Sequence, residues 1–468
     1  MTFLHPEQVA LVRRNWSGPA RISGAAGTGK TVVALHRAAH LAQRTTGRVL
    51  YVTFANNLPR VQGTFLRSMS PAAADRVEFR SLHAWALKFL EERGTAHRLH
   101  GDGARTAFSR AWVHCGRDSV LSTIDASSHY WREEIDCVIK GRGIRRFEEY
   151  ALLGRHRRRI NLRRPHREAV WALYEEYERV REERGVHDFN DVLSLALAEV
   201  RARPDGLPYA AVIADEVQDL TLVGVRLLHA LVGDAPNGLL LVGDGQQSVY
   251  PGGFRLTDAG IDVRGDRSQI LRTNYRNAKE IIDAALAVVA GDSFDDIDGT
   301  RTAGLRDIDP TYHDGTVTRA RSRNPAEHDA ALLTALREAG REAWADSAVL
   351  CPSQRETDRY RRLLAGAGIP VHPLDQYDGH PVAAVKLGTY RRAKGLEFKH
   401  VYLPDHDPVV PAAADADIVR ERQELARSQL FVAMTRARDT LWLGTVEREA
   451  VGRETVERTA VERAAAEG

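Results

Sequence analysis

The stretch RISGAAGTGKTVVALHR, residues 21–37, joins an apolar segment to an Ala-, Val- and Leu-rich segment through a loop with three glycines. This order predicts a strand, a tight turn and a helix. Residues 24–31 match the pattern G-x-x-x-x-G-K-[ST], in which backbone N–H groups face a polyphosphate, the lysine reaches the β- and γ-phosphates and the hydroxyl ligates Mg²⁺. The residues that would do this are Gly24, Gly27, Gly29, Lys30 and Thr31. The alternative is a glycine-rich turn that only caps a helix.

A pair of acids follows a second apolar segment, YAAVIADEVQD, residues 209–219. Such a segment is typical of a strand buried in a parallel sheet. Ligands of open α/β sheets bind at the carboxyl ends of the strands, so Asp215 would lie near Mg²⁺ and Glu216 would take a proton from the attacking water. The alternative is two solvated acids at the end of a strand.

A third apolar segment, GLLLVGDGQQSVY, residues 238–250, runs into a polar turn. The turn carries Gln246 and Gln247 and looks like a γ-phosphate sensor. Taken alone, the segment equally fits a Gly-Asp turn with surface glutamines.

The composition is that of a globular protein: 468 residues, 43% hydrophobic and 28% charged, with a net charge of +3. The length suggests about three domains of ~150 residues. No apolar stretch reaches the ~20 residues of a membrane span and the N-terminus lacks signal-peptide order, so we expect a soluble, cytoplasmic protein without a membrane partner. Only seven of the 66 basic residues are lysines, and Lys30 and Lys394 both lie in glycine-bearing segments, where a compact ammonium suits the site better than a guanidinium.

Together these motifs resemble those of superfamily 1 DNA helicases of the UvrD/Rep type. Eight segments follow the order of that family, in addition to the phosphate loop: LHPEQ (the Q motif), VTFANNL (Ia), RSLHAWA (Ib), DEVQD (II), VGDGQQSVY (III), LRTNYRN (IV), GTYRRAKGLEF (V) and LFVAMTRAR (VI).

The resemblance implies further ATP-site residues. Gln8 would read adenine, Tyr275 would stack on it and Glu397 would bind the ribose. Gln247 would take the role of the γ-phosphate sensor. Arg276 and Arg436 would act as arginine fingers, because charge spreads over the phosphoryl oxygens in the transition state; such an arginine is worth about 10³ to 10⁵ in rate. Taken alone, Arg276 also fits an exposed position at the start of a helix, and Arg436 a position at the end of a helix, facing its dipole.

The resemblance also implies a set of DNA contacts. Relatives often carry a base-stacking tryptophan where this chain has Gly252, and we expect Phe254 to replace it. Arg391 stands where relatives usually have histidine. The expected contacts are Thr53, Phe54, His83, Tyr250, Phe254, Thr389 and Arg391.

The expected fold class is α/β, with two RecA-like P-loop NTPase domains and a helical accessory insertion in the first. The run GRHRRRINLRRPHRE, residues 154–168, would be either a phosphate-tracking patch or a solvated surface. Residues 277–388, between motifs IV and V, leave no room for the large second-lobe insertion of UvrD and Rep. The expected boundaries are 1–95 and 185–278 for the first domain, 96–184 for the basic accessory domain, 279–455 for the second domain and 456–468 for a charged tail.

The sequence therefore predicts an ATP- and Mg²⁺-dependent translocase or helicase, moving 3′→5′ on single-stranded DNA or a tailed duplex, in DNA repair, recombination or defence. A protein such as a nuclease or repair factor would be its partner. The alternative is an ATP-gated DNA-binding or recruitment subunit without unwinding activity. A stand-alone nucleotide kinase is disfavoured by the arginines of the second lobe.

Overall fold

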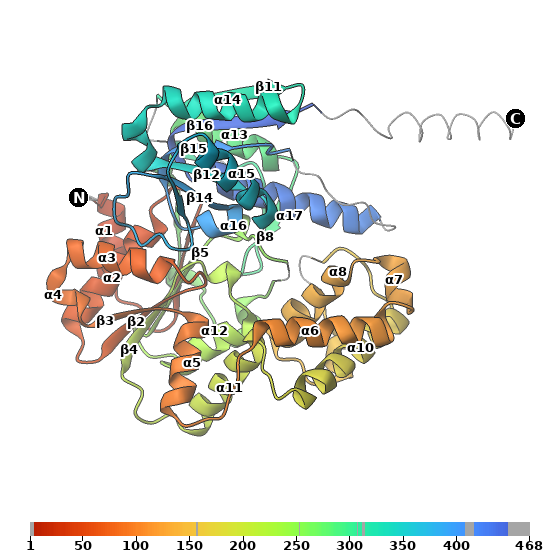
Figure 1. Ribbon diagram of the computed structural model, residues 1–468. Helices are drawn as coiled ribbons and strands as arrows, with labels where there is room; N and C mark the ends of the chain where they lie inside the picture. Colours follow the sequence, from red (N-terminus) through yellow and green to blue (C-terminus); the bar gives the residue numbers. More distant parts are fainter. Residues whose placement is uncertain are drawn as a thin grey trace, which may run out of the picture.

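A computed structural model describes residues 4–155, 158–251, 253–306, 308–310, 314–407 and 416–447. Two parallel six-stranded sheets form two lobes, and a helical accessory domain lies beside the first lobe and below the second (Figure 1). This is the expected α/β class with two RecA-like domains.

The elements of the first lobe are α1 (Pro6–Arg13), β1 (Ala20–Gly24), α2 (Lys30–Arg44), β2 (Arg48–Thr53), α3 (Leu58–Met69), α4 (Pro71–Ala74), β3 (Val77–Ser81), α5 (Leu82–Glu92), α11 (Phe189–Ala202), β4 (Tyr209–Ala214), α12 (Leu222–Ala230), β5 (Leu239–Gly243) and β6 (Ser268–Leu271). The accessory helices are α6 (Gly101–Ala111), α7 (Val120–Ile124), α8 (Ser128–Glu133), α9 (Phe147–Leu152) and α10 (Arg164–Glu183).

The second lobe follows β7 (Thr273–Asn274). Its elements are α13 (Lys279–Val289), β8 (Ser293–Asp295), β9 (Arg301–Ala303), β10 (Asp309–Pro310), β11 (Thr316–Ser322), α14 (Pro325–Glu338), β12 (Ser347–Cys351), α15 (Gln354–Gly366), β13 (Val371–Pro373), β14 (Val385–Thr389), α16 (Tyr390–Ala393), β15 (Phe398–Leu403), α17 (Ala416–Met434) and β16 (Ala437–Val446).

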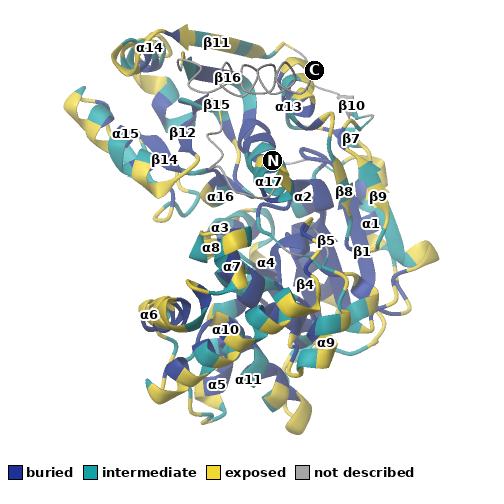
Figure 2. Cartoon of the chain, turned by 90° about the vertical axis from the view of Figure 1, so that its right-hand side faces the viewer, coloured by how far each residue is buried: buried dark blue, intermediate teal, exposed yellow. Residues whose placement is uncertain are grey.

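The sheet of the first lobe has the strand order β3-β2-β4-β5-β1-β6. The two central strands, β4 and β5, carry apolar residues along their length because helices cover both faces of the sheet, and Figure 2 shows how deeply this region is buried. Alternate residues of β2 show this: Val49 and Tyr51 pack with α1, α2 and α3, whereas Leu50 and Val52 pack with α5, α11 and α12. The carboxyl ends of β1, β4 and β5 therefore lie at one edge, where the phosphate loop and the acids follow.

The sheet of the second lobe has the order β11-β16-β15-β12-β14-β13 and is built in the same way. On β15, Val401 and Leu403 face the core of α13, α16 and α17, whereas Tyr402 faces the core of α14 and α15. The first of these cores also takes in Leu58 and Val249 from the first lobe, so the two lobes share buried apolar surface.

The accessory domain has its own core around Trp131 and Tyr150, both fully buried. Ile418, from α17 of the second lobe, belongs to the same core and is fully buried too. The accessory domain is therefore attached to both lobes. Among the described residues, no helix combines the length and the hydropathy needed to cross a membrane.

Candidate functional site

The phosphate loop lies between β1 and α2 and has the backbone that its glycines permit. Gly27 and Gly29 have φ of +77° and +80°, a region that disfavours other residues. A Cβ at Gly27 would lie 2.4 Å from Oδ1 of Asn274, and one at Gly29 would lie 2.6 Å from Nε2 of Gln8. Glycine is therefore required at both positions, by the backbone conformation and by the close approach of Asn274 and Gln8.

Lys30 is buried at the start of α2, directly behind this loop. Its Nζ donates hydrogen bonds of 2.8 Å to the carbonyl oxygens of Gly24 and Ala25. Burial lowers the pKa of Lys30, and the carboxylates of Asp244 and Glu216 oppose that shift. The ammonium is held within the loop in a position from which it can turn to a phosphate.

Thr31 and Asp215 meet where we expected magnesium. The Thr31 hydroxyl donates to Oδ2 of Asp215 at 2.9 Å, and the Tyr51 hydroxyl and the Gln62 amide donate to the same oxygen. Burial, and then the charge of Glu216, raise the pKa of Asp215 to about 6. A hydroxyl and a carboxylate at the end of a strand are the hard oxygen ligands that Mg²⁺ prefers, so these residues fit the ion.

Glu216 follows in the left-handed conformation, with φ of +55°. Its Oε2 accepts a 2.6 Å hydrogen bond from Gln218 and lies 3.5 Å from Nζ of Lys394. Burial alone would raise the pKa of Glu216, but Lys394, Lys30 and Arg436 more than offset this and lower it. Glu216 is thus ionised and able to accept a proton.

Two cations of the second lobe reach this edge of the first lobe. NH2 of Arg436 donates to Oε1 of Gln247 at 3.2 Å. Nζ of Lys394 donates to Oδ2 of Asp219 at 2.6 Å and to the main-chain oxygen of Gln247. Burial, and then repulsion by Arg276, lower the pKa of Arg436 to about 9. Sequence reasoning gave Lys394 no role, although its rarity as a lysine in a glycine-bearing motif was a signal.

The residues expected around the base and ribose lie together on the other side of the loop. Gln8 is buried and donates to the carbonyl of Thr28, and the Tyr275 ring, 36% exposed, lies 5.8 Å from the His5 ring. Arg276 donates through Nε to Oε2 of Glu397 at 2.6 Å. Arg276, one of the two expected arginine fingers, is therefore paired with Glu397, the expected ribose ligand.

Four of the expected DNA contacts form a continuous surface, which we call the aromatic row. The ring of Phe54 lies 4.9 Å from that of Tyr250 and 6.2 Å from that of His83, and the Arg391 guanidinium lies 5.1 Å from the Tyr250 ring. Burial lowers the pKa of His83 to about 4, which keeps the ring neutral at pH 7. Phe189, 51% exposed, extends the row with its ring 5.1 Å from His83. It begins α11, away from every motif, so nothing in the sequence marked it.

The two expected threonines are used internally. Thr53 is fully buried and its hydroxyl donates to the carbonyl of Ala55. Thr389 caps the N-terminus of α16, where its hydroxyl accepts from the backbone N–H of Arg392. The geometry thus gives no support for a DNA contact by the Thr53 side chain, because the hydroxyl does not reach the surface.

With this geometry in view, residues 4–262, more than half of the chain, match the family model of the UvrD/REP helicase N-terminal domain. The chain belongs to the UvrD/REP helicase family. Residues 375–448 also match the model of the UvrD-like helicase C-terminal domain.

Individual relatives of this UvrD/REP chain are distant and longer. The putative ATP-dependent DNA helicase YjcD of Bacillus subtilis is 27% identical over 61% of this chain and 38% of its own length. The ATP-dependent DNA helicase PcrA of Leuconostoc citreum is 25% identical over 75% of this chain and 47% of its own. UvrD1 of Mycobacterium tuberculosis H37Rv is 26% identical over 78% and 49%. The chain spans less than half the length of these relatives.

The expectation that Phe254 replaces the stacking tryptophan of UvrD/REP relatives is not supported. Phe254 is 6% exposed and packs in the core of the first lobe with Leu256, Ile261 and Ile297. A ring held there cannot stack on a base without leaving the core. Gly252, the other half of that argument, lies outside the described residues.

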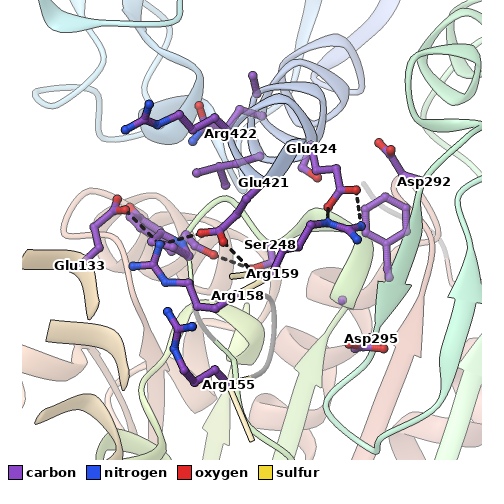
Figure 3. A pocket seen from close by; sticks show the side chains of 18 of the residues that line it. Glu133, Arg155, Arg158, Arg159, Ser248, Asp292, Asp295, Glu421, Arg422 and Glu424 are labelled. Atoms are coloured by element: carbon purple, nitrogen blue, oxygen red, sulfur yellow. Dashed lines mark hydrogen bonds and ion pairs between the residues drawn. The ribbon is translucent and has the colours of Figure 1, made fainter. Parts of the chain in front are cut away.

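Within the basic run, Arg158 and Arg159 are paired with carboxylates of the second lobe, whereas Arg163 and Arg164 are exposed at the surface. Arg158 is 1% exposed, and its NH1 pairs with Oε1 of Glu421 on α17 at 2.6 Å. The neighbouring Arg159 donates through Nε to Oε2 of Glu424 at 2.8 Å, also on α17. Figure 3 shows both pairs bridging the two elements. Arg158 is therefore neither solvated nor free for phosphates, and Arg159, although 34% exposed, is already paired with a carboxylate of the second lobe. Arg157 lies outside the described residues.

This bridge closes one side of a cavity of about 670 Å³. Tyr250 and Arg391, from the end of the aromatic row, line the same cavity. Arg422 of α17 adds a third ion pair across the gap, to Asp125 of the accessory domain. The aromatic row therefore ends at this cavity, which lies between the accessory domain and α17.

Proposed function

We propose that this chain is an ATP-dependent motor that moves 3′→5′ on single-stranded DNA. The observation that carries the proposal is the contact of Arg436 with Gln247, at 3.2 Å, which brings a cation of the second lobe to the acids and the phosphate loop of the first. A nucleotide bound at that loop would lie between the lobes, so hydrolysis would change how they fit together.

The residues of the site divide the chemistry among them. Lys30 would bind the β- and γ-phosphates, and Thr31 and Asp215 would hold Mg²⁺. When bound, Mg²⁺ would neutralise charge on the phosphate oxygens. Glu216 would take the proton of the attacking water, and Arg436 with Gln247 would stabilise the charge that spreads over the transferred group. Arg276 and Glu397 would separate from each other to contact phosphate and ribose.

The aromatic row is the candidate strand-binding surface. Aromatic stacking tolerates any base and is worth ~1–3 kcal/mol per base, so binding would depend little on sequence. Phe54, Tyr250 and the newly found Phe189 would supply the rings, and Arg391 a cation beside them. From the same DNA-directed function, we also propose that the protein works in the cytoplasm.

We expect ATP hydrolysis to depend on Mg²⁺ and to rise at least about tenfold when oligo(dT) is added, because the strand would bridge the two lobes and bring the arginines to the phosphates. The measurement is the steady-state ATPase rate with and without oligo(dT), with EDTA as the metal control. A rate that oligo(dT) leaves unchanged would contradict the proposal.

We also expect the isolated protein to move along single strands but to unwind long duplexes poorly. Each base-pair step costs roughly 1.4 kcal/mol in stacking, so a motor needs a surface that holds the duplex at the junction. Residues 277–388 lack the large insertion of the second lobe, and Phe254 is buried. A partner such as a nuclease or repair factor would supply that surface.

The test compares two reactions of one preparation: displacement of streptavidin from biotinylated single strands, and single-turnover unwinding of 3′-tailed duplexes of increasing length. We expect displacement to be efficient and unwinding to fall steeply with duplex length. Efficient unwinding of long duplexes by the monomer would refute the need for a partner. ATP hydrolysis on DNA without displacement would instead indicate an ATP-gated binding subunit.

A further inference from the structure

Arg306 belongs to none of the sequence motifs, yet its side chain contacts Asp244 of motif III. It follows the hairpin of β8 and β9, and its NH1 pairs with Oδ1 of Asp244 at 2.8 Å. The side chain of Asp244 is 1% exposed and that of Arg306 is 15% exposed. A buried carboxylate needs such a partner, because removing the partner leaves a charge without compensation.

Asp244 in turn orients the γ-phosphate sensor. Its Oδ2 accepts a 2.9 Å hydrogen bond from Nε2 of Gln247, and its Oδ1 accepts from the backbone N–H of Gln246 at 3.1 Å. Gln247 thus turns its amide nitrogen to Asp244 and its amide oxygen to Arg436. The chain of contacts runs from Arg306 through Asp244 and Gln247 to Arg436.

Several contacts hold the hairpin against the first lobe and thereby hold Arg306 in place. Arg21 of β1, fully buried, pairs with both Asp296 and Asp298 of the hairpin. The Gln246 amide donates to the carbonyl of Gly304 at 2.7 Å. On the other side, Arg427 of α17 forms a bidentate ion pair with Asp292. The hairpin therefore ties motif III of the first lobe to α17 of the second.

We propose that Arg306 is a positioning residue for ATP hydrolysis, which acts through Asp244 to hold Gln247 in the orientation that meets Arg436. The inference rests on the proposed ATPase function and concerns the hydrolysis step alone. Without Arg306, the buried charge of Asp244 would lose its paired cation, and Asp244 would no longer hold the Gln247 amide in a fixed orientation. Arg306 contacts neither the expected site for the nucleotide base nor the aromatic row. Binding of ATP and DNA should therefore be retained.

The test compares Arg306→Met, Arg306→Lys and the control Arg321→Met, whose arginine is exposed on β11. We expect Arg306→Met to lower kcat at saturating ATP and oligo(dT) by about 10- to 100-fold, because a small misplacement of a catalytic group costs that much. The KM for ATP and the Kd for oligo(dT) should change by less than about twofold. Arg306→Lys keeps the charge and should restore kcat to within about threefold of the wild type. Arg321→Met should match the wild type.

Two further readouts separate positioning from a structural role. Arg306→Met should weaken binding of ADP with aluminium fluoride, which resembles the transition state, by about tenfold while leaving ADP binding unchanged. In an Asp244→Asn background it should lower kcat by less than about twofold more, because the two residues act through one path. An unchanged kcat, equal loss of ADP and ADP–aluminium fluoride binding, or full additivity with Asp244→Asn would each overturn the inference. If the wild type itself hydrolyses no ATP on DNA, it is the proposed function that fails.

Discussion

Glu216→Gln is expected to lower ATP turnover on single-stranded DNA by about 10²- to 10⁴-fold, the range that a positioned general base contributes. Burial opposes ionisation of Glu216, but Lys394, Lys30 and Arg436 together lower its pKa, so the wild-type group is a carboxylate at pH 7. Glutamine has the same shape and no capacity to take the proton. ATP binding should persist, since the phosphate cradle and Lys30 are unchanged.

Turnover is measured in a coupled assay, and binding by fluorescence of a labelled ATP analogue. Lys30→Ala provides the contrast, because it should lose turnover and also weaken nucleotide binding. The matched control is Glu338→Gln, which changes an exposed acid at the end of α14 and should behave as wild type. If Glu216→Gln protein turned over ATP at the wild-type rate, the assigned mechanism would be wrong.

Arg158→Met is expected to destabilise the accessory domain by about 3–5 kcal/mol, the cost of removing one partner of a buried ion pair. Arg158 lies 3.4 Å from Glu134 and 2.6 Å from Glu421, and its guanidinium lies 4.3 Å from the Tyr130 ring. Glu134 is fully buried, so the substitution leaves Arg155 as its paired cation and removes the cation paired with Glu421. One of the two side-chain pairs that connect the accessory domain to α17 would be lost as well.

Hydrogen exchange of the backbone amides of α8 and α10, followed by mass spectrometry, measures this change locally. Arg159→Met is the control next in sequence: its side chain is 34% exposed and pairs with a 28% exposed Glu424, so the cost should be about 0–1 kcal/mol. Equal exchange rates in wild-type and Arg158→Met protein would show that the buried pair does not hold the domain together.

Local sequence was sufficient for the fold class and for the family, both of which are confirmed. The phosphate loop illustrates why: Gly27 and Gly29 adopt a backbone that other residues disfavour, so the motif itself specifies the geometry. The apolar strands before Asp215 and before the motif III turn could be predicted from the sequence for a similar reason. A strand that is covered on both faces is rich in apolar residues along its whole length. The roles of individual site residues and the domain boundaries stay predictions.

Tertiary structure alone decided which side chains are available at the surface and which charges are already paired. Phe254 and Phe189 are both phenylalanines near candidate sites, yet one packs in a core and the other extends the aromatic row. In the sequence Arg158 belongs to a basic run, but in the fold Glu421, distant in the chain, lies beside it and neutralises its charge. Burial and ion pairing depend on what other elements bring to a residue, and a linear pattern holds no information about those partners. The sequence by itself determined the strands, the phosphate loop and their order. The packing of the accessory domain and of the hairpin against the lobes determined which side chains are exposed and which charges are paired.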